Sequence, residues 1–291
     1  AGAAVVRPAV GFAGSAAGLA AAAVAAAAVR LSSAGRPAEA MAIMQVAAAG
    51  TQFNAAAKLL WASLSGETGT AARLAGGVGG TWAGPPRGEA LRTPYAKELA
   101  LLRFVFAHAR AGDPASVCEQ MERFGEEVLP PAGGWLKLAG GRKVEVLAEA
   151  VAQAPRGSSW LEIGTYCGYS AVRLASAGPG RVGSVATVEA DPVHAIIAQN
   201  IVVFAGLAHV VDIIIGHSAE VLTRLRERAS VPRLPFDGVF LDARGSGYDA
   251  DLATLERQDL LSPRAVVVAD NVLKPGAPLF LWRVLKGPDW E

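Results

Sequence analysis

Residues 158–175 read SSWLEIGTYCGYSAVRLA, and this stretch decides the fold. Residues 160–163 form a short apolar run that ends at Gly164, a pattern typical of a buried strand. Gly164 and Gly168 then turn the chain into residues 171–175, which have helix-forming composition. A strand that passes through a glycine turn into a helix points backbone N–H groups at the space beyond the sheet edge, where a nucleotide can bind. An ordinary tight strand–helix turn has the same pattern, so this stretch alone leaves both interpretations open.

Strands and helices alternate along the rest of the chain. Apolar runs bounded by turn residues predict strands over residues 160–164, 184–189, 211–215, 236–241 and 265–269. Helical segments are expected to begin near Tyr169, Pro192, Ala219 and Asp251, and three further helices are expected over residues 97–109, 114–128 and 143–154, with Asp113 as an N-cap. This alternation predicts an α/β fold, a Rossmann-like, doubly wound and mostly parallel sheet with helices on both faces. Ligands of such sheets bind beyond the carboxyl ends of the strands.

The first third of the chain differs in composition from the rest. We divide the chain into an Ala-rich helical extension (1–65), a Gly- and Pro-rich linker (66–94) and a globular domain (95–291). Residues 8–29 carry no charge and are long enough for a bilayer-spanning helix, which needs roughly 20 residues. A membrane anchor over 8–30, an organellar targeting peptide and a disordered low-complexity arm are all compatible with this composition. We expect a membrane-associated protein of a chloroplast or mitochondrion, with a cytoplasmic location as the alternative.

The charge balance and the cysteine count exclude some classes of function. The net charge is only +1 and no basic cluster is present, which argues against nucleic acid as a partner. The two cysteines, Cys118 and Cys167, lack metal-ligand or redox spacing and are expected to be ordinary buried thiols.

Polar residues follow the predicted strands at their carboxyl ends. Glu162 and Gly164 end the first strand, and Glu189 ends the second at the spacing expected for a carboxylate that binds a ribose. After the third strand, either the imidazole of His217 or the hydroxyl of Ser218 could meet a purine base. Oxygen ligands from Asp242, Asp270 and Asn271, after the fourth and fifth strands, suit Mg²⁺. Each of these acids can instead cap the following helix.

Several motifs together resemble the catechol O-methyltransferase family of S-adenosylmethionine-dependent enzymes. They are LEIGTYCGYSAVRLA, VATVEAD, FDGVFLDA and VVVADNVLKPGAP, and the similarity runs from about Leu101 to the end of the sequence. The resemblance implies a Rossmann-like methyltransferase acting on a small aromatic hydroxyl substrate. It implies that S-adenosylmethionine lies over the strand ends and that Mg²⁺ is bound beside it. The implied cofactor residues are Glu162, Gly164, Tyr166, Ser170, Glu189 and Ser218, and the implied metal ligands are Asp242, Asp270 and Asn271.

This sequence departs from the family pattern near the predicted metal site and at its C-terminal end. The family's general-base lysine corresponds to Gly245, and Gly245 and Gly247 are expected to leave this loop loose. Lys274, beside Pro275, is the replacement base that we consider. The sequence ends at Glu291, before the two last strands and a substrate-binding glutamate of the family. Either the protein lacks these strands or they follow the given sequence. If they are absent, the fifth strand lies at a sheet edge, where a partner protein could cover it.

Two functions therefore remain open. The first is a Mg²⁺-assisted, S-adenosylmethionine-dependent O-methyltransferase of the catechol type, tethered to a membrane. The second is a catalytically weak or inactive methyltransferase-like domain that serves as a structural subunit of a membrane complex, with partner subunits bound through the N-terminal helices.

Overall fold

The structure is a computed structural model that describes residues 84–85, 87–88, 95–136, 138, 141–227, 233–287 and 290 of the 291-residue chain. The predicted Ala-rich extension, the anchor at 8–30 and most of the predicted linker lie outside the described residues. Within the described part of the chain, no helix combines the length and apolar character needed to cross a bilayer.

The helices predicted ahead of the sheet are present. They are α5 (Ala96–His108), α6 (Pro114–Arg123) and α7 (Arg142–Gln153), and α6 continues into a π-helical turn, η2 (Phe124–Val128), which a short 3₁₀ turn, η3 (Pro130–Ala132), follows. The Asp113 side chain caps α6 by accepting the backbone N–H of Ser116 at 3.0 Å, as predicted.

All five predicted strands form one parallel sheet in the order β3-β2-β1-β4-β5. Their bounds are β1 (Ser158–Ile163), β2 (Val182–Glu189), β3 (Val211–Ile215), β4 (Phe236–Leu241) and β5 (Leu261–Ala269). The predicted Rossmann-like α/β class is confirmed. Among the described residues β5 pairs only with β4, so it is an edge strand of this sheet.

Each face of the sheet has its own apolar core. Alternate residues of β1 point to opposite faces, so that Trp160 belongs to one core, and Leu161 and Ile163 belong to the other. The Trp160 core packs against α5, α6, α7, α8 (Tyr169–Ala175) and α9 (Pro192–Phe204). The opposite core packs against α10 (Ser218–Val221), the 3₁₀ turn η4 (Leu222–Glu227), α11 (Tyr248–Arg257) and α12 (Pro278–Lys286).

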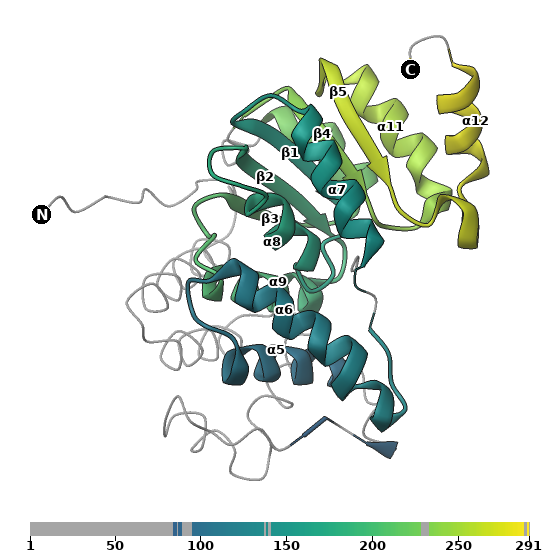
Figure 1. Cartoon of the computed structure of the whole chain (residues 1–291). Helices are drawn as coiled ribbons and strands as arrows, with labels where there is room; N and C mark the ends of the chain where they lie inside the picture. Colours follow the sequence, from purple (N-terminus) through teal and green to yellow (C-terminus); the bar gives the residue numbers. More distant parts are fainter. Residues whose placement is uncertain are drawn as a thin grey trace, which may run out of the picture.

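Figure 1 shows the sheet together with the helices that pack around it. Helix α7 contacts β5 and α8, while α5 and α6 pack together, α5 against α9 and α6 against α8. Both cysteines, Cys118 and Cys167, are buried free thiols, as predicted. Burial raises the pKa of the Cys167 thiol well above its ordinary value, so this thiol is an inert packing group.

Candidate functional site

Four neighbouring strands end in one row of residues at the carboxyl edge of the sheet. Glu189 is the last residue of β2, and Gly164, Asp242 and Asp270 directly follow β1, β4 and β5. The backbone N–H groups of Gly164, Asp242 and Asp270 each donate to a carbonyl of the adjacent strand, at 2.9, 2.9 and 2.8 Å. Because neighbouring strands lie about 4.8 Å apart, Glu189 and Asp270 are separated by about 14 Å along this edge. The residues predicted from separate strand ends therefore share one rim.

Gly164 allows the ends of β1 and β4 to approach each other closely. Its φ is +105°, and a Cβ atom at this position would lie 2.2 Å from the carbonyl oxygen of Asp242. No side chain fits in that space. The glycine turn predicted from the sequence thus has a packing role at Gly164.

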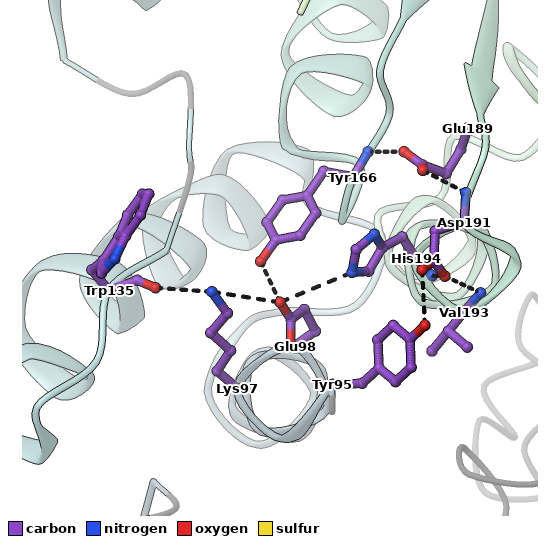
Figure 2. A network of polar contacts seen from close by, with 9 residues as sticks. All are labelled: Tyr95, Lys97, Glu98, Trp135, Tyr166, Glu189, Asp191, Val193 and His194. Atoms are coloured by element: carbon purple, nitrogen blue, oxygen red, sulfur yellow. Dashed lines mark hydrogen bonds and ion pairs between the residues drawn. The ribbon is translucent and has the colours of Figure 1, made fainter. Parts of the chain in front are cut away.

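The carboxylate of Glu189 is fixed by two backbone N–H groups. Oε2 accepts the N–H of Tyr166 at 2.7 Å, and Oε1 accepts the N–H of Asp191 at 2.8 Å (Figure 2). The Tyr166 backbone that donates this N–H has a left-handed conformation, with φ of 48°. Each carboxylate oxygen retains a further acceptor position. Glu189 is therefore oriented at the rim and can still accept hydrogen bonds from a ligand, while Asp191 caps α9 through the N–H groups of Val193 and His194.

The ring of Tyr166 is held from the other side by Glu98 of α5. The Tyr166 hydroxyl donates to Glu98 Oε1 at 2.6 Å (Figure 2). Lys97 Nζ and His194 Nε2 lie 3.7 and 3.9 Å from the same oxygen. Burial raises the pKa of the Tyr166 phenol, and the nearby carboxylates of Glu98 and Glu189 raise it further. Tyr166 is thus a neutral donor clamped between the Glu189 carboxylate and the Glu98 carboxylate.

Tyr95 connects α5 to α9 at the same place. Its hydroxyl donates to Asp191 Oδ2 at 2.8 Å, and its ring meets the His194 ring edge-on at 5.5 Å between centroids (Figure 2). The His194 ring also meets the Tyr166 ring edge-on, at 4.7 Å. The helical segment ahead of the sheet therefore takes part in fixing the turn after β1.

Glu162 is a fully buried carboxyl group one strand away from Glu189. Its Oε2 accepts the Thr187 hydroxyl at 2.5 Å, whereas its buried Oε1 has no hydrogen-bond partner among the described residues. Burial raises the pKa of Glu162 to about 8, and the charges of Asp242 and Glu189 contribute, while the hydroxyls of Ser170 and Thr187 oppose the shift. An unpartnered buried carboxyl oxygen next to the rim is the kind of atom that a bound ligand satisfies.

The predicted metal ligands Asp242, Asp270 and Asn271 come from adjacent strand ends. Burial raises the pKa of the Tyr248 phenol, and the charges of Asp242 and Asp270 raise it further. Asp270 Oδ1 accepts the backbone N–H of Asn271 at 2.6 Å, and its Oδ2 accepts Lys143 Nζ at 2.5 Å. Among the described residues no three His, Cys, Asp or Glu side chains are grouped as a metal site. The predicted set is of another kind, with two carboxylates and one amide.

Gly245 is packed more tightly than expected. The expectation of a loose loop is wrong at this residue, because a Cβ atom on Gly245 would lie 2.6 Å from the carbonyl oxygen of Gly276. The 3₁₀ turn η5 (Gly245–Gly247) therefore rests directly on the backbone of the π-helical turn η6 (Val272–Gly276). A lysine could not be accommodated at position 245 without a backbone shift.

Two other predicted residues lie at the margins of the rim. Ser218 begins α10, and its hydroxyl lies beside Asp251, where it partly opposes the raised pKa that burial gives this carboxyl group. Lys274 is an exposed residue of η6, three residues after Asn271.

Sequence reasoning missed the side chains that hold the rim from outside it. Glu98 was overlooked, although the sequence holds a signal for it. This acid lies in a helix beside the apolar residues Leu99, Leu101 and Leu102, which are buried in the structure. Lys143 gave no comparable signal, because its partner Asp270 lies 127 residues away in the sequence.

Comparison with known proteins gives consistent matches to methyltransferases. A family model described as O-methyltransferase matches residues 150–279. Catechol O-methyltransferase of Mus musculus is 40% identical over 195 residues, which cover 67% of this chain and 70% of that protein. Transmembrane O-methyltransferase of Propithecus coquereli is 38% identical over 180 residues, which cover 61% of this chain and 62% of that protein. A solved O-methyltransferase of Bacillus cereus in complex with SAH matches with a TM-score of 0.45 and 27% identity, covering 51% of this chain and 71% of that one.

Proposed function

The chain belongs to the catechol O-methyltransferase family of S-adenosylmethionine-dependent methyltransferases, and from this premise we propose that it methylates a hydroxyl group of a small aromatic substrate with the help of Mg²⁺. The observation that carries the proposal is the row formed by Gly164, Glu189, Asp242 and Asp270 at one edge of the sheet. In this row the oriented carboxylate of Glu189 lies about 10 Å from Asp242 and about 14 Å from Asp270. An oriented carboxylate and hard oxygen ligands are the two kinds of group needed to hold a nucleoside donor and a metal-bound acceptor.

The methyl donor would bind along the rim formed by β1, β2 and β3. Glu189 would accept the ribose hydroxyls, since both of its oxygens are oriented by backbone N–H groups and retain acceptor positions. Glu162 supports a donor here because its Oε1 is buried without a partner. S-adenosylmethionine supplies an electrophilic methyl group when it is bound. The further residues that we assign to its binding are Gly164, Tyr166, Ser170 and Ser218.

Asp242, Asp270 and Asn271 would hold Mg²⁺ at the other end of the row. Their oxygens are ligands that a hard divalent ion prefers, and their adjacent strand ends suit the few protein ligands that Mg²⁺ takes. The ion would act as a Lewis acid that favours the ionised form of the acceptor hydroxyl. The remaining role of the protein is to align the acceptor oxygen with the methyl group.

Lys274 is the residue that we propose as proton acceptor. The family's lysine position is Gly245, which is packed against Gly276, and Lys274 is the basic side chain on the turn that directly follows Asn271. Loss of a general base typically lowers the rate by about 10²–10⁴-fold.

Transfer of a labelled methyl group from S-adenosylmethionine to catechol, with and without Mg²⁺, tests this function. We expect Mg²⁺-dependent transfer by the full chain and a slower rate for Lys274→Ala. Donor binding without transfer to any catechol would contradict the enzyme and favour the second function below, whereas an unchanged rate in Lys274→Ala would remove only Lys274 from the mechanism.

The second candidate is a weakly active or inactive methyltransferase-like subunit of a membrane complex. It is favoured by Gly245 at the family's lysine position and by the occupation of Asp270 by Lys143. Membrane association is supported by the relatives that are named transmembrane O-methyltransferases. Co-sedimentation of the full chain with lipid vesicles, compared with a chain lacking residues 8–30, tests the proposed anchor.

A further inference from the structure

The carboxylate of Asp270 already has a cation bound to it. Lys143 is the second residue of α7, and its Nζ donates to Asp270 Oδ2 at 2.5 Å. The other oxygen, Oδ1, accepts the backbone N–H of Asn271 at 2.6 Å. The Asp270 side chain is 13% exposed and that of Lys143 is 47% exposed, so a mostly buried acid is neutralised by an ammonium group that reaches it from the solvent side.

We infer that Lys143 is a built-in competitor for the divalent ion, and that an ion binds to Asp242, Asp270 and Asn271 only by displacing the Lys143 ammonium from Asp270 Oδ2. This inference rests on the metal site of the proposed function. Each oxygen of Asp270 accepts one hydrogen bond and keeps a second acceptor position, so the competition is electrostatic. The Lys143 ammonium at Oδ2 and a divalent ion at the same carboxylate repel each other. Mg²⁺ also requires its oxygen ligands at 2.0–2.1 Å in near-octahedral geometry, which an ammonium group on the same oxygen obstructs.

The position of Lys143 allows this displacement. Its side chain is half exposed, so the ammonium can move into water without burial of a charge. The lost ion pair costs little, because the Lys143 partner is half exposed and water screens its attraction to Asp270. Among the described residues no other Lys or Arg forms an ion pair with Asp270. The ion affinity of this rim is therefore set by one side chain of α7, a helix that lies outside the predicted metal site.

Calorimetric titration of MgCl₂ into the full chain, without donor or acceptor, tests the inference. We expect Lys143→Met to bind Mg²⁺ roughly two- to fivefold more tightly than the unchanged chain, since the competing ammonium is gone. Lys143→Gln is a second variant that keeps a polar side chain and is expected to give the same direction. Arg142→Met is the matched control, because it removes one positive charge from the adjacent exposed residue of α7. The Mg²⁺ affinity of this variant should stay within about twofold of that of the unchanged chain. Asp270→Asn should lose the binding.

Each result decides the inference separately from the proposed function. Suppose that both Lys143 variants bind Mg²⁺ no more tightly than the unchanged chain, while Asp270→Asn does not bind it. This result would overturn the competition and leave the proposed metal site intact. The same gain in Arg142→Met as in Lys143→Met would also overturn it, because the effect would then be one of general charge. Absence of Mg²⁺ binding from every variant would overturn the inference together with the metal part of the proposed function, while donor binding is measured independently.

Discussion

Glu162 combines complete burial with an unsatisfied carboxyl oxygen, and this has a consequence for stability. Its pKa is raised to about 8, from an ordinary value of 4.5. Between these two values the unfolded chain has lost the proton that the folded chain keeps. The unfolded state therefore binds fewer protons, and the contribution of Glu162 to stability falls as the pH rises from about 4.5 to about 8.

Glu162→Gln should remove this pH dependence. Gln keeps an acceptor for the Thr187 hydroxyl and carries no charge, so the variant should match the unchanged chain near pH 4.5 and exceed it in melting temperature at pH 8 or above. The expected difference is on the order of a few kcal/mol. Thermal unfolding of both proteins across this range gives the measurement. If the melting temperatures of the two proteins differ by the same amount at every pH, Glu162 does not titrate in this way.

The Tyr166 hydroxyl and the Glu98 carboxylate form a pair whose loss should be costly. Tyr166→Phe removes the donor and leaves the Glu98 carboxylate with less compensation in a buried position. A hydrogen bond to a charged group contributes about 1.5–3 kcal/mol, and we expect a coupling energy of at least about 1 kcal/mol.

A double-mutant cycle measures this coupling through chemical denaturation. It compares Tyr166→Phe, Glu98→Gln and the double variant with the unchanged chain. Additive changes in the free energy of unfolding would contradict the direct pair, whereas Tyr95→Phe serves as a control that breaks a different bond of the same network, to Asp191.

At the scale of secondary-structure elements, the contact between η5 and η6 closes the rim beside Asp242 and Asp270. It depends on the absence of a side chain at residue 245, where a Cβ atom would lie 2.6 Å from the Gly276 carbonyl oxygen. At Gly247 the nearest atom to such a Cβ would be Asp251 Oδ2 at 3.6 Å, an ordinary contact. Neither glycine has a left-handed φ, so the two positions differ in space and not in backbone strain.

Gly245→Ala should therefore destabilise the protein by about 1–3 kcal/mol, the usual cost of overpacking. Gly247→Ala should stay within about 0.5 kcal/mol. Differential scanning calorimetry of the two variants separates these outcomes. If both variants melt like the unchanged chain, the close approach of η5 to η6 is incorrect.

At the scale of the whole molecule, the fold was predictable because its signals are local. Each strand is an apolar run bounded by turn residues, and the parallel direction of the strands follows from the helices between them. The rim residues followed from the same reasoning, since parallel strands bring their carboxyl ends to one edge. The strand bounds differ from those expected by at most four residues, with the largest difference at the start of β5.

The contacts between distant elements were not predictable in this way. Lys143 meets Asp270 and Glu98 meets Tyr166 only because α7 and α5 pack against the sheet and its helices. The close approach of Gly245 to Gly276 likewise depends on how two turns pack. Such contacts carry no periodic pattern in the sequence, so the signal that could have suggested them is limited to an acid such as Glu98 within an apolar helix.

Binding of S-adenosylmethionine to the full chain, measured by isothermal titration calorimetry, tests the central claim most directly. We expect one donor molecule per chain, and affinity lower by at least about tenfold in Glu189→Ala, because the variant loses the oriented carboxylate at the rim. Circular dichroism shows whether the variant is folded. Failure of the donor to bind the unchanged chain, or equal affinity in a folded Glu189→Ala variant, would contradict the claim that this edge of the sheet is the donor site.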